Sequence, residues 1–184
     1  ILTIIPLYSE ATAEEETRTD ETWTVLSYMN GEGNLEDFIV NDLLEMERVG
    51  SSDNVNIVVQ IDLGTDTRYP STVATWTETR RYKVEYHPED GIGSTRLDDP
   101  PLGEINMDDP QSLRDFLTWG LTNYPADNYM IALEGHADGV ARGLMKDEKS
   151  THSQSKLMPA RDLSIIDICE PTRLYDISYA VFCL

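Results

Sequence analysis

Hydrophobic positions along the chain follow two patterns, which together predict alternating strands and helices. Residues 22–28 are β-branched and aromatic, and residues 55–63 form a nearly continuous apolar run typical of a strand covered on both faces. Between them, apolar residues recur at spacings of three and four from Leu35 to Val49, including Phe38, which predicts a helix with one buried face. Strand, helix and strand in this order predict a right-handed crossover between parallel strands.

The second half of the chain continues this alternation. Asp109 followed by Pro110 predicts the start of a helix, because Asp caps the end and Pro suits the first helical position. Residues 128–133 and 163–168 are apolar runs that predict two more strands. The sequence therefore predicts an α/β layered fold with a mostly parallel sheet flanked by helices.

Three further segments complete the organisation of the chain. Residues 72–77 and 81–86 alternate in polarity and predict a hairpin inserted after the second strand. Residues 88–107 and 137–160 are rich in loop-forming or polar residues and predict connections without regular structure.

The two ends of the chain have unusual patterns. Apolar residues from Ile1 to Leu7 precede the small residues of Ala11-Thr12-Ala13 and then acidic residues, the usual order in the rear half of a secretory signal. We therefore expect residues 1–21 to be a signal remnant and acidic leader, and 22–184 to be the domain. The chain stops at Leu184 in an apolar run, and an exposed hydrophobic strand tends to aggregate, so we expect this domain to be incomplete at its C-terminus.

Charge and cysteine content exclude several classes of function. The chain has 184 residues, 14 basic and 34 acidic side chains, and a formal charge of −20. Phosphate backbones and anionic lipids attract basic clusters, so we expect no nucleic-acid partner and no electrostatic membrane docking. No apolar run is long enough for a membrane span. An acidic protein suits cationic partners, such as basic substrate side chains or calcium.

A histidine and a cysteine follow two of the predicted strands. His136 comes after residues 128–133, and Cys169 comes directly after residues 163–168. Neighbouring parallel strands end at one edge of a sheet, where an imidazole could deprotonate a thiol and make it a nucleophile. Asp167 shares a strand face with Cys169 and could bind a basic substrate side chain. The alternative is structural: a turn histidine and a buried core cysteine.

Several segments resemble the clostripain family of cysteine peptidases. They run in family order from about residue 22 to about residue 148. The resemblance is carried by the stretches Thr22-Trp23-Thr24-Val25-Leu26-Ser27-Tyr28-Met29-Asn30-Gly31, Met46-Glu47-Arg48-Val49-Gly50-Ser51-Ser52, Val55-Asn56-Ile57-Val58-Val59-Gln60-Ile61-Asp62, Thr79-Arg80-Arg81-Tyr82, Leu102-Gly103-Glu104-Ile105-Asn106-Met107 and Asp109-Pro110-Gln111-Ser112-Leu113-Arg114-Asp115-Phe116-Leu117-Thr118-Trp119-Gly120.

This resemblance implies a caspase-like fold and a secreted or cell-surface endopeptidase that cleaves polypeptides after Arg or Lys by a Cys-His dyad. It implies that His136 is the acid/base, Cys169 the nucleophile, Asp167 the residue that selects basic side chains, and Ala137 part of the oxyanion site. Calcium assistance is frequent in the family. Self-cleavage is also frequent, and we expect it in the loop that carries Lys146, Lys149 and Lys156.

The sequence departs from the family pattern near both catalytic positions. Ala137 stands where the family usually has Gly, and Pro171 disturbs the expected continuation after Cys169. Cys183 is the alternative nucleophile: its distance from His136 is more usual, but Val181 stands where the selecting Asp is expected. A third interpretation is that the sequence past about Leu157 is out of frame and neither cysteine reacts. A catalytically inert scaffold or binding domain on the same fold is the competing functional class.

Overall fold

The computed structural model describes residues 21–32, 35–64, 73–74, 76–137, 145 and 157–158, and the backbone of residues 177–183. The predicted signal remnant lies outside the described residues, except for Glu21. The same is true of the predicted strand over 163–168 and of the lysine-containing loop.

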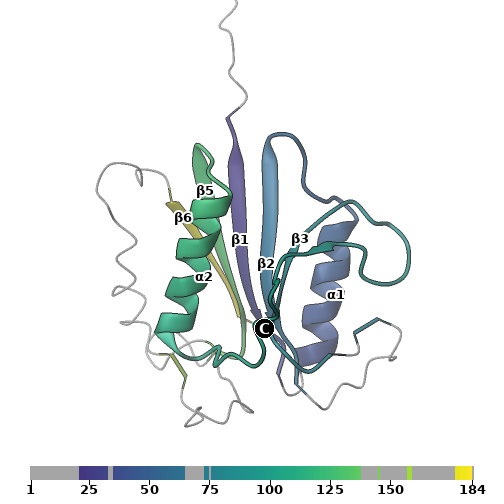
Figure 1. The fold of residues 1–184 in the computed structure, drawn as a ribbon, viewed down its shortest axis with the longest axis vertical. Helices are drawn as coiled ribbons and strands as arrows, with labels where there is room; N and C mark the ends of the chain where they lie inside the picture. The colour runs from purple at the N-terminus through teal and green to yellow at the C-terminus, as the bar shows by residue number, and fades with distance from the viewer. Residues whose placement is uncertain are drawn as a thin grey trace, which may run out of the picture.

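Six strands form one sheet, in the order β4-β3-β2-β1-β5-β6 (Figure 1). The pairs β1–β2, β1–β5 and β5–β6 are parallel, whereas β3 pairs antiparallel with both β2 and β4. The prediction of a mostly parallel sheet flanked by helices is thereby confirmed. The strands are β1 (Trp23–Asn30), β2 (Val55–Asp62), β3 (Arg80–Lys83), β4 (Thr95–Arg96), β5 (Asn128–Gly135) and β6 (Ile177–Cys183).

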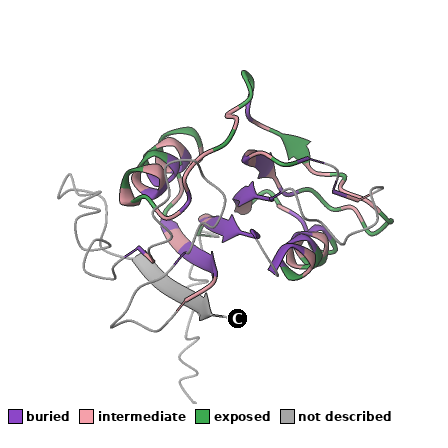
Figure 2. Ribbon diagram, turned by 90° about the horizontal axis from the view of Figure 1, so that it is seen from below, coloured by how far each residue is buried: buried purple, intermediate pink, exposed green. Residues whose placement is uncertain are grey.

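Two helices, α1 (Glu36–Glu47) and α2 (Pro110–Asn123), cover opposite faces of this sheet (Figure 2). Each helix buries an apolar stripe against the strands, and the two stripes form two separate clusters. On the α2 face the cluster includes Leu26, Tyr28, Leu113, Phe116 and Leu133. On the α1 face it includes Met29, Ile39, Leu43, Val59 and Ile61. Because β1 and β2 are covered on both faces, apolar residues occur on both faces of each strand.

Both helices were expected, but two residues of the first were wrongly placed on its buried face. Asp109 caps α2 as predicted: its side chain accepts a hydrogen bond from the Gln111 N–H at 2.9 Å, and Pro110 begins the helix. Phe38 and Val49, which the apolar spacing placed on the buried face of the first helix, are exposed. Phe38 lies on the helix face of polar Asn41, and Val49 lies beyond the helix end.

The prediction of a hairpin between residues 72–77 and 81–86 is wrong, because the second segment pairs with other strands. Residues 73–74 and 76–77 are not in a strand, and β3 pairs instead with β2 and the short β4. Side chains explain this pairing: the Arg81 Nε–H donates to Gln60 Oε1 on β2 at 2.8 Å, and the guanidinium lies 4.4 Å from the Trp119 ring centroid on α2. Arg81 thus docks β3 onto the sheet and the helix together.

Candidate active site at the carboxyl edge of the sheet

The carboxyl ends of the parallel strands form a row of residues along one edge of the sheet. Asn30 at the end of β1 pairs in register with Asp62 at the end of β2, and Gly135 at the end of β5 pairs with Cys183 at the end of β6. Asn30 and Gly135 also adjoin, since an ideal Cβ built on Gly135 would lie 3.2 Å from the Asn30 Cβ. Reacting groups of open α/β sheets gather beyond this edge, which makes it the candidate active site.

His136 follows Gly135 directly and is half-buried. Because Gly135 is opposite Cys183, the described backbone brings a histidine and a cysteine to the ends of two neighbouring parallel strands. In the sequence analysis, Cys183 was the alternative to Cys169. Cys169 and Asp167 lie outside the described residues, so their assignment stays a prediction.

A buried methionine packs onto the end of β5. An ideal Cβ on Gly135 would lie 3.3 Å from the Met145 sulfur, and Met145 is almost fully buried in the core cluster of the α2 face. Its backbone φ is 58°, and its carbonyl accepts a hydrogen bond from the Met158 N–H at 3.5 Å. Ala137 packs against the same cluster. Sequence reasoning missed both methionines, because they occur in a polar stretch without periodicity.

A buried carboxyl group lies two residues before His136. Glu134 is 6% exposed and accepts a hydrogen bond from the Ser27 hydroxyl at 2.6 Å. Burial raises the pKa of Glu134 above its ordinary value; the Ser27 hydrogen bond opposes this rise, and the charge of Asp42 adds to it. The pattern of the strand marked this position as polar but gave no sign that its side chain is buried.

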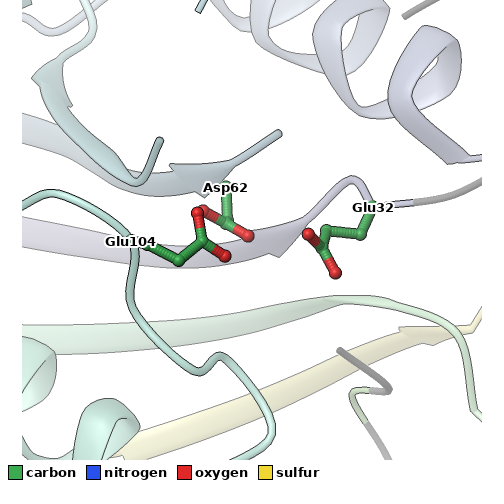
Figure 3. Close-up of side chains that lie close together, drawn as sticks. All are labelled: Glu32, Asp62 and Glu104. Carbon is green, nitrogen blue, oxygen red and sulfur yellow. The ribbon is translucent and has the colours of Figure 1, made fainter. Parts of the chain in front are cut away.

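Three carboxylates gather beside the row, at the ends of β1 and β2 (Figure 3). Glu32, Asp62 and Glu104 each offer an oxygen within 4.8 Å of the others, and the first two side chains are buried. Glu32 belongs to the turn after β1, and Glu104 belongs to the long connection between β4 and α2. The sequence gave no signal for this group, because its members lie far apart along the chain.

Thr79 ties two parts of this carboxylate group together. Its hydroxyl donates to Asp62 Oδ1 at 2.6 Å and accepts from the Ile105 N–H at 3.1 Å. The Thr79 N–H also donates to the Gly103 carbonyl at 3.0 Å. These bonds fix the segment that carries Glu104 against the end of β2.

The carboxylate group has the donor chemistry that calcium requires. Calcium binds six to eight hard oxygen ligands, and carboxylates are its usual protein ligands. Glu32, Asp62 and Glu104 supply such oxygens from three separate segments, and exposed Glu104 leaves the group accessible to water. These residues fit a hard divalent cation better than a soft one, because neither His nor Cys belongs to the group.

Within the described residues, no helix is long and apolar enough to cross a membrane. A model of the clostripain family matches residues 27–156. Clostripain from Hathewaya histolytica is 26% identical over 140 residues, a match that covers 71% of this chain and 26% of the relative. The chain therefore spans about a quarter of the length of that curated relative.

Solved structures of bacterial cysteine proteases have the same fold. A secreted C11 cysteine protease from Bacteroides thetaiotaomicron, solved with an irreversible peptide inhibitor, matches with 20% identity and a TM-score of 0.58. An inactive zymogen C11 protease from Parabacteroides distasonis matches with 17% identity and a TM-score of 0.56. Each match covers 88% of this chain and 42% of the other. At these identities the likeness shows the fold.

Proposed function

We propose that this chain, which belongs to the clostripain family, carries the histidine and the cysteine of a cysteine endopeptidase site. The observation that carries the proposal is the register of β5 and β6, in which Gly135, the residue before His136, is opposite Cys183. Family membership supplies the reaction class, and this register supplies a thiol and an imidazole on neighbouring strands.

The proposed reaction is acyl transfer through a thiolate. His136 takes the thiol proton, and the thiolate sulfur attacks the substrate carbonyl carbon to form a tetrahedral intermediate. When this intermediate collapses, the protonated imidazole gives its proton to the leaving amine, and a thioester remains. Water, deprotonated by His136, then hydrolyses the thioester and restores the thiol. The backbone N–H of Ala137 is the proposed donor to the oxyanion.

Two cysteines compete for the role of nucleophile. Cys183 is supported by its position at the end of β6, beside the strand that leads to His136. Cys169 is supported by the local sequence Asp167-Ile168-Cys169. We propose Cys183 on the ground of register, and Cys169 is the alternative that the experiment below tests.

Basic substrate side chains are the proposed specificity. The family resemblance points to cleavage after Arg or Lys, and the formal charge of −20 favours the approach of cationic peptides. Asp167 is the proposed selecting residue if Cys169 is the nucleophile. Export of the protein is proposed from the signal-like N-terminal pattern, and one of the similar solved proteins is described as secreted.

Calcium is the proposed ligand of the carboxylate group. Glu32, Asp62 and Glu104 would hold the ion, which supplies positive charge where two buried carboxylates meet. Neutralisation of these charges would stabilise the connection of Glu104 to the sheet edge.

Peptide hydrolysis by single-residue variants tests the proposal. The chain is incubated with a fluorogenic peptide that has Arg at the cleavage site, with reductant, and with or without calcium. We expect His136→Ala to lower turnover by roughly 10²- to 10⁴-fold, and Cys183→Ala to abolish it while Cys169→Ala leaves it unchanged. Loss in Cys169→Ala alone would reassign the nucleophile.

An inert scaffold is the second candidate function. Ala137 favours it, because the family usually has Gly at this oxyanion position and Ala adopts the positive φ open to Gly only at an energetic cost. No turnover by the parent chain, together with tight binding of an Arg peptide that carries no electrophilic group, would support a binding domain over a peptidase.

A further inference from the structure

The end of β5 is in close contact on three sides at Gly135. Asn30 of β1 adjoins it on one side, and Cys183 of β6 is opposite it in register on the other. The Met145 sulfur lies where a side chain of residue 135 would be, 3.3 Å from an ideal Cβ. Because glycine has only a hydrogen there, Asn30 and Met145 approach the end of β5 more closely than a residue with a side chain would allow.

Met145 is held firmly in this place. It is 1% exposed, it packs in the core cluster that contains Leu133, and its carbonyl accepts the Met158 N–H. Its φ of 58° is uncommon for a residue other than glycine, and such a conformation persists only where surrounding contacts enforce it. The sulfur is therefore a fixed contact for β5.

We infer that Gly135 and Met145 are positioning residues that set the distance between His136 and the cysteine at the end of β6. His136 follows Gly135 through one planar peptide, so a displacement of residue 135 moves the histidine backbone with it. A base and its nucleophile must approach within about 2.6–3.2 Å, so a shift of a few tenths of an ångström changes their coupling. This inference rests on the proposed dyad and adds the pair that fixes its geometry.

Thiol reactivity tests the inference without any need for peptide turnover. The rate of iodoacetamide alkylation is measured from pH 5 to pH 9, and peptide mass spectrometry assigns it to each cysteine. We expect Cys183 of the parent to react at lower pH than in His136→Ala, because the imidazole stabilises the thiolate. Gly135→Ala should move the profile toward that of His136→Ala and slow alkylation at pH 6 by about tenfold.

Two further variants separate positioning from general destabilisation. Gly120→Ala adds a methyl group to the same core, 2.6 Å from the Leu26 Cδ2 and away from the strand ends, so it should lower the Tm without changing the alkylation profile. The double variant Gly135→Ala with Met145→Ala removes the contact with the Met145 sulfur and leaves the two with Asn30. It should recover part of the reactivity while its Tm falls further, because the lost methionine leaves a cavity.

The outcomes distinguish the two proposals. If the parent and His136→Ala have the same profile at both cysteines, no dyad exists and the inference fails with it. If these two profiles differ but Gly135→Ala matches the parent, the dyad stands and the positioning role is overturned. A change in Gly120→Ala as large as that in Gly135→Ala, or no recovery in the double variant, would also overturn it.

Discussion

Two threonine–aspartate pairs lie at opposite edges of the same sheet, and they differ in environment. At the amino edge, the Thr22 hydroxyl donates to Asp127 Oδ2 at 2.8 Å, and Asp127 is exposed. At the carboxyl edge, the Thr79 hydroxyl donates to Asp62 Oδ1 at 2.6 Å, and both side chains are fully buried. The bond is the same, but only the second aspartate is removed from water.

The amino edge satisfies its polar groups with side-chain and backbone hydrogen bonds between the segments that precede β1 and β5. Asp127 accepts from the Thr22 N–H and donates its own N–H to the Thr22 hydroxyl, while the Asn128 N–H bonds the Thr22 carbonyl. The carboxyl edge instead buries Glu32, Asp62 and Glu134, although ionised groups are costly to bury. These costly buried groups lie at the edge that also carries the candidate dyad. Functional sites are often less stable than the rest of a fold, because activity requires groups that do not favour folding.

Removal of the buried Thr79 hydroxyl should have the largest effect on the free energy of unfolding. Thr79→Val leaves Asp62 and the Ile105 N–H without that partner, so we expect a loss of about 2–3 kcal/mol in the free energy of unfolding. Urea denaturation of the parent and the variant measures the difference. Thr79→Ser, which keeps the hydroxyl, is the matched control, and an equal loss in both variants would assign the effect to the methyl group.

Calcium should strengthen the carboxyl edge alone. At about ten times its Kd, a ligand bound only by the folded state adds about 1.4 kcal/mol of stability. We expect calcium to raise the Tm of the parent by a few degrees and to leave the Tm of Asp62→Asn unchanged. The amide of the variant keeps the Thr79 hydrogen bond but removes a charged ligand. Differential scanning calorimetry with calcium and with magnesium measures this, and an equal rise in the variant would remove Asp62 from the site.

Glu134 should make the carboxyl edge less stable as the pH rises. Burial raises its pKa in the folded state. Below the pKa of the unfolded state, about 4.3, the carboxyl group is protonated in both the folded and the unfolded protein, so burial costs no ionisation energy. Above that value the unfolded state ionises first, and stability falls until the pH passes the folded pKa. Glu134→Gln should raise stability by about 1 kcal/mol at pH 8 and have little effect at pH 4. A Tm difference independent of pH would contradict this.

The amino edge should show the smallest effect and the opposite dependence on pH. Hydrogen bonds from the backbone and hydroxyl of Thr22 lower the pKa of Asp127, so this pair stabilises the fold above the unfolded pKa and is lost as the pH falls. Thr22→Val should lower the Tm by about 1–2 °C at pH 7 and by less at pH 3. A loss as large as that of Thr79→Val would remove the contrast between the two edges.

Local patterns predicted most of the elements but not every burial. The runs that became β1 and β2, and the cap at Asp109, follow from side-chain periodicity and helix-end chemistry, which are local properties. Phe38 was misassigned because only its apolar neighbours were weighed, although polar Asn41 shares its helix face. The partners of β3 were misassigned because strand pairing depends on contacts such as that of Arg81 with Gln60, across 21 residues of sequence.

Part of the candidate site lies where the sequence predicted it. His136 follows a strand, β5, as expected, whereas the choice between Cys169 and Cys183 stays a prediction, because residue 169 lies outside the described residues and a short motif says nothing of register. The carboxylate group, Met145 and the burial of Glu134 had no sequence signal, since each is defined by segments that meet only in the folded chain.

By itself, the sequence determined the α/β class, the acidic surface charge and the presence of a histidine at a strand end, because periodicity and composition act over a few residues at a time. Only the tertiary structure decided that Gly135 is opposite Cys183, that Met145 fills the space beside this glycine, and that three distant carboxylates share one corner. Such juxtapositions depend on how strands pair and pack over long separations, and no local pattern encodes them.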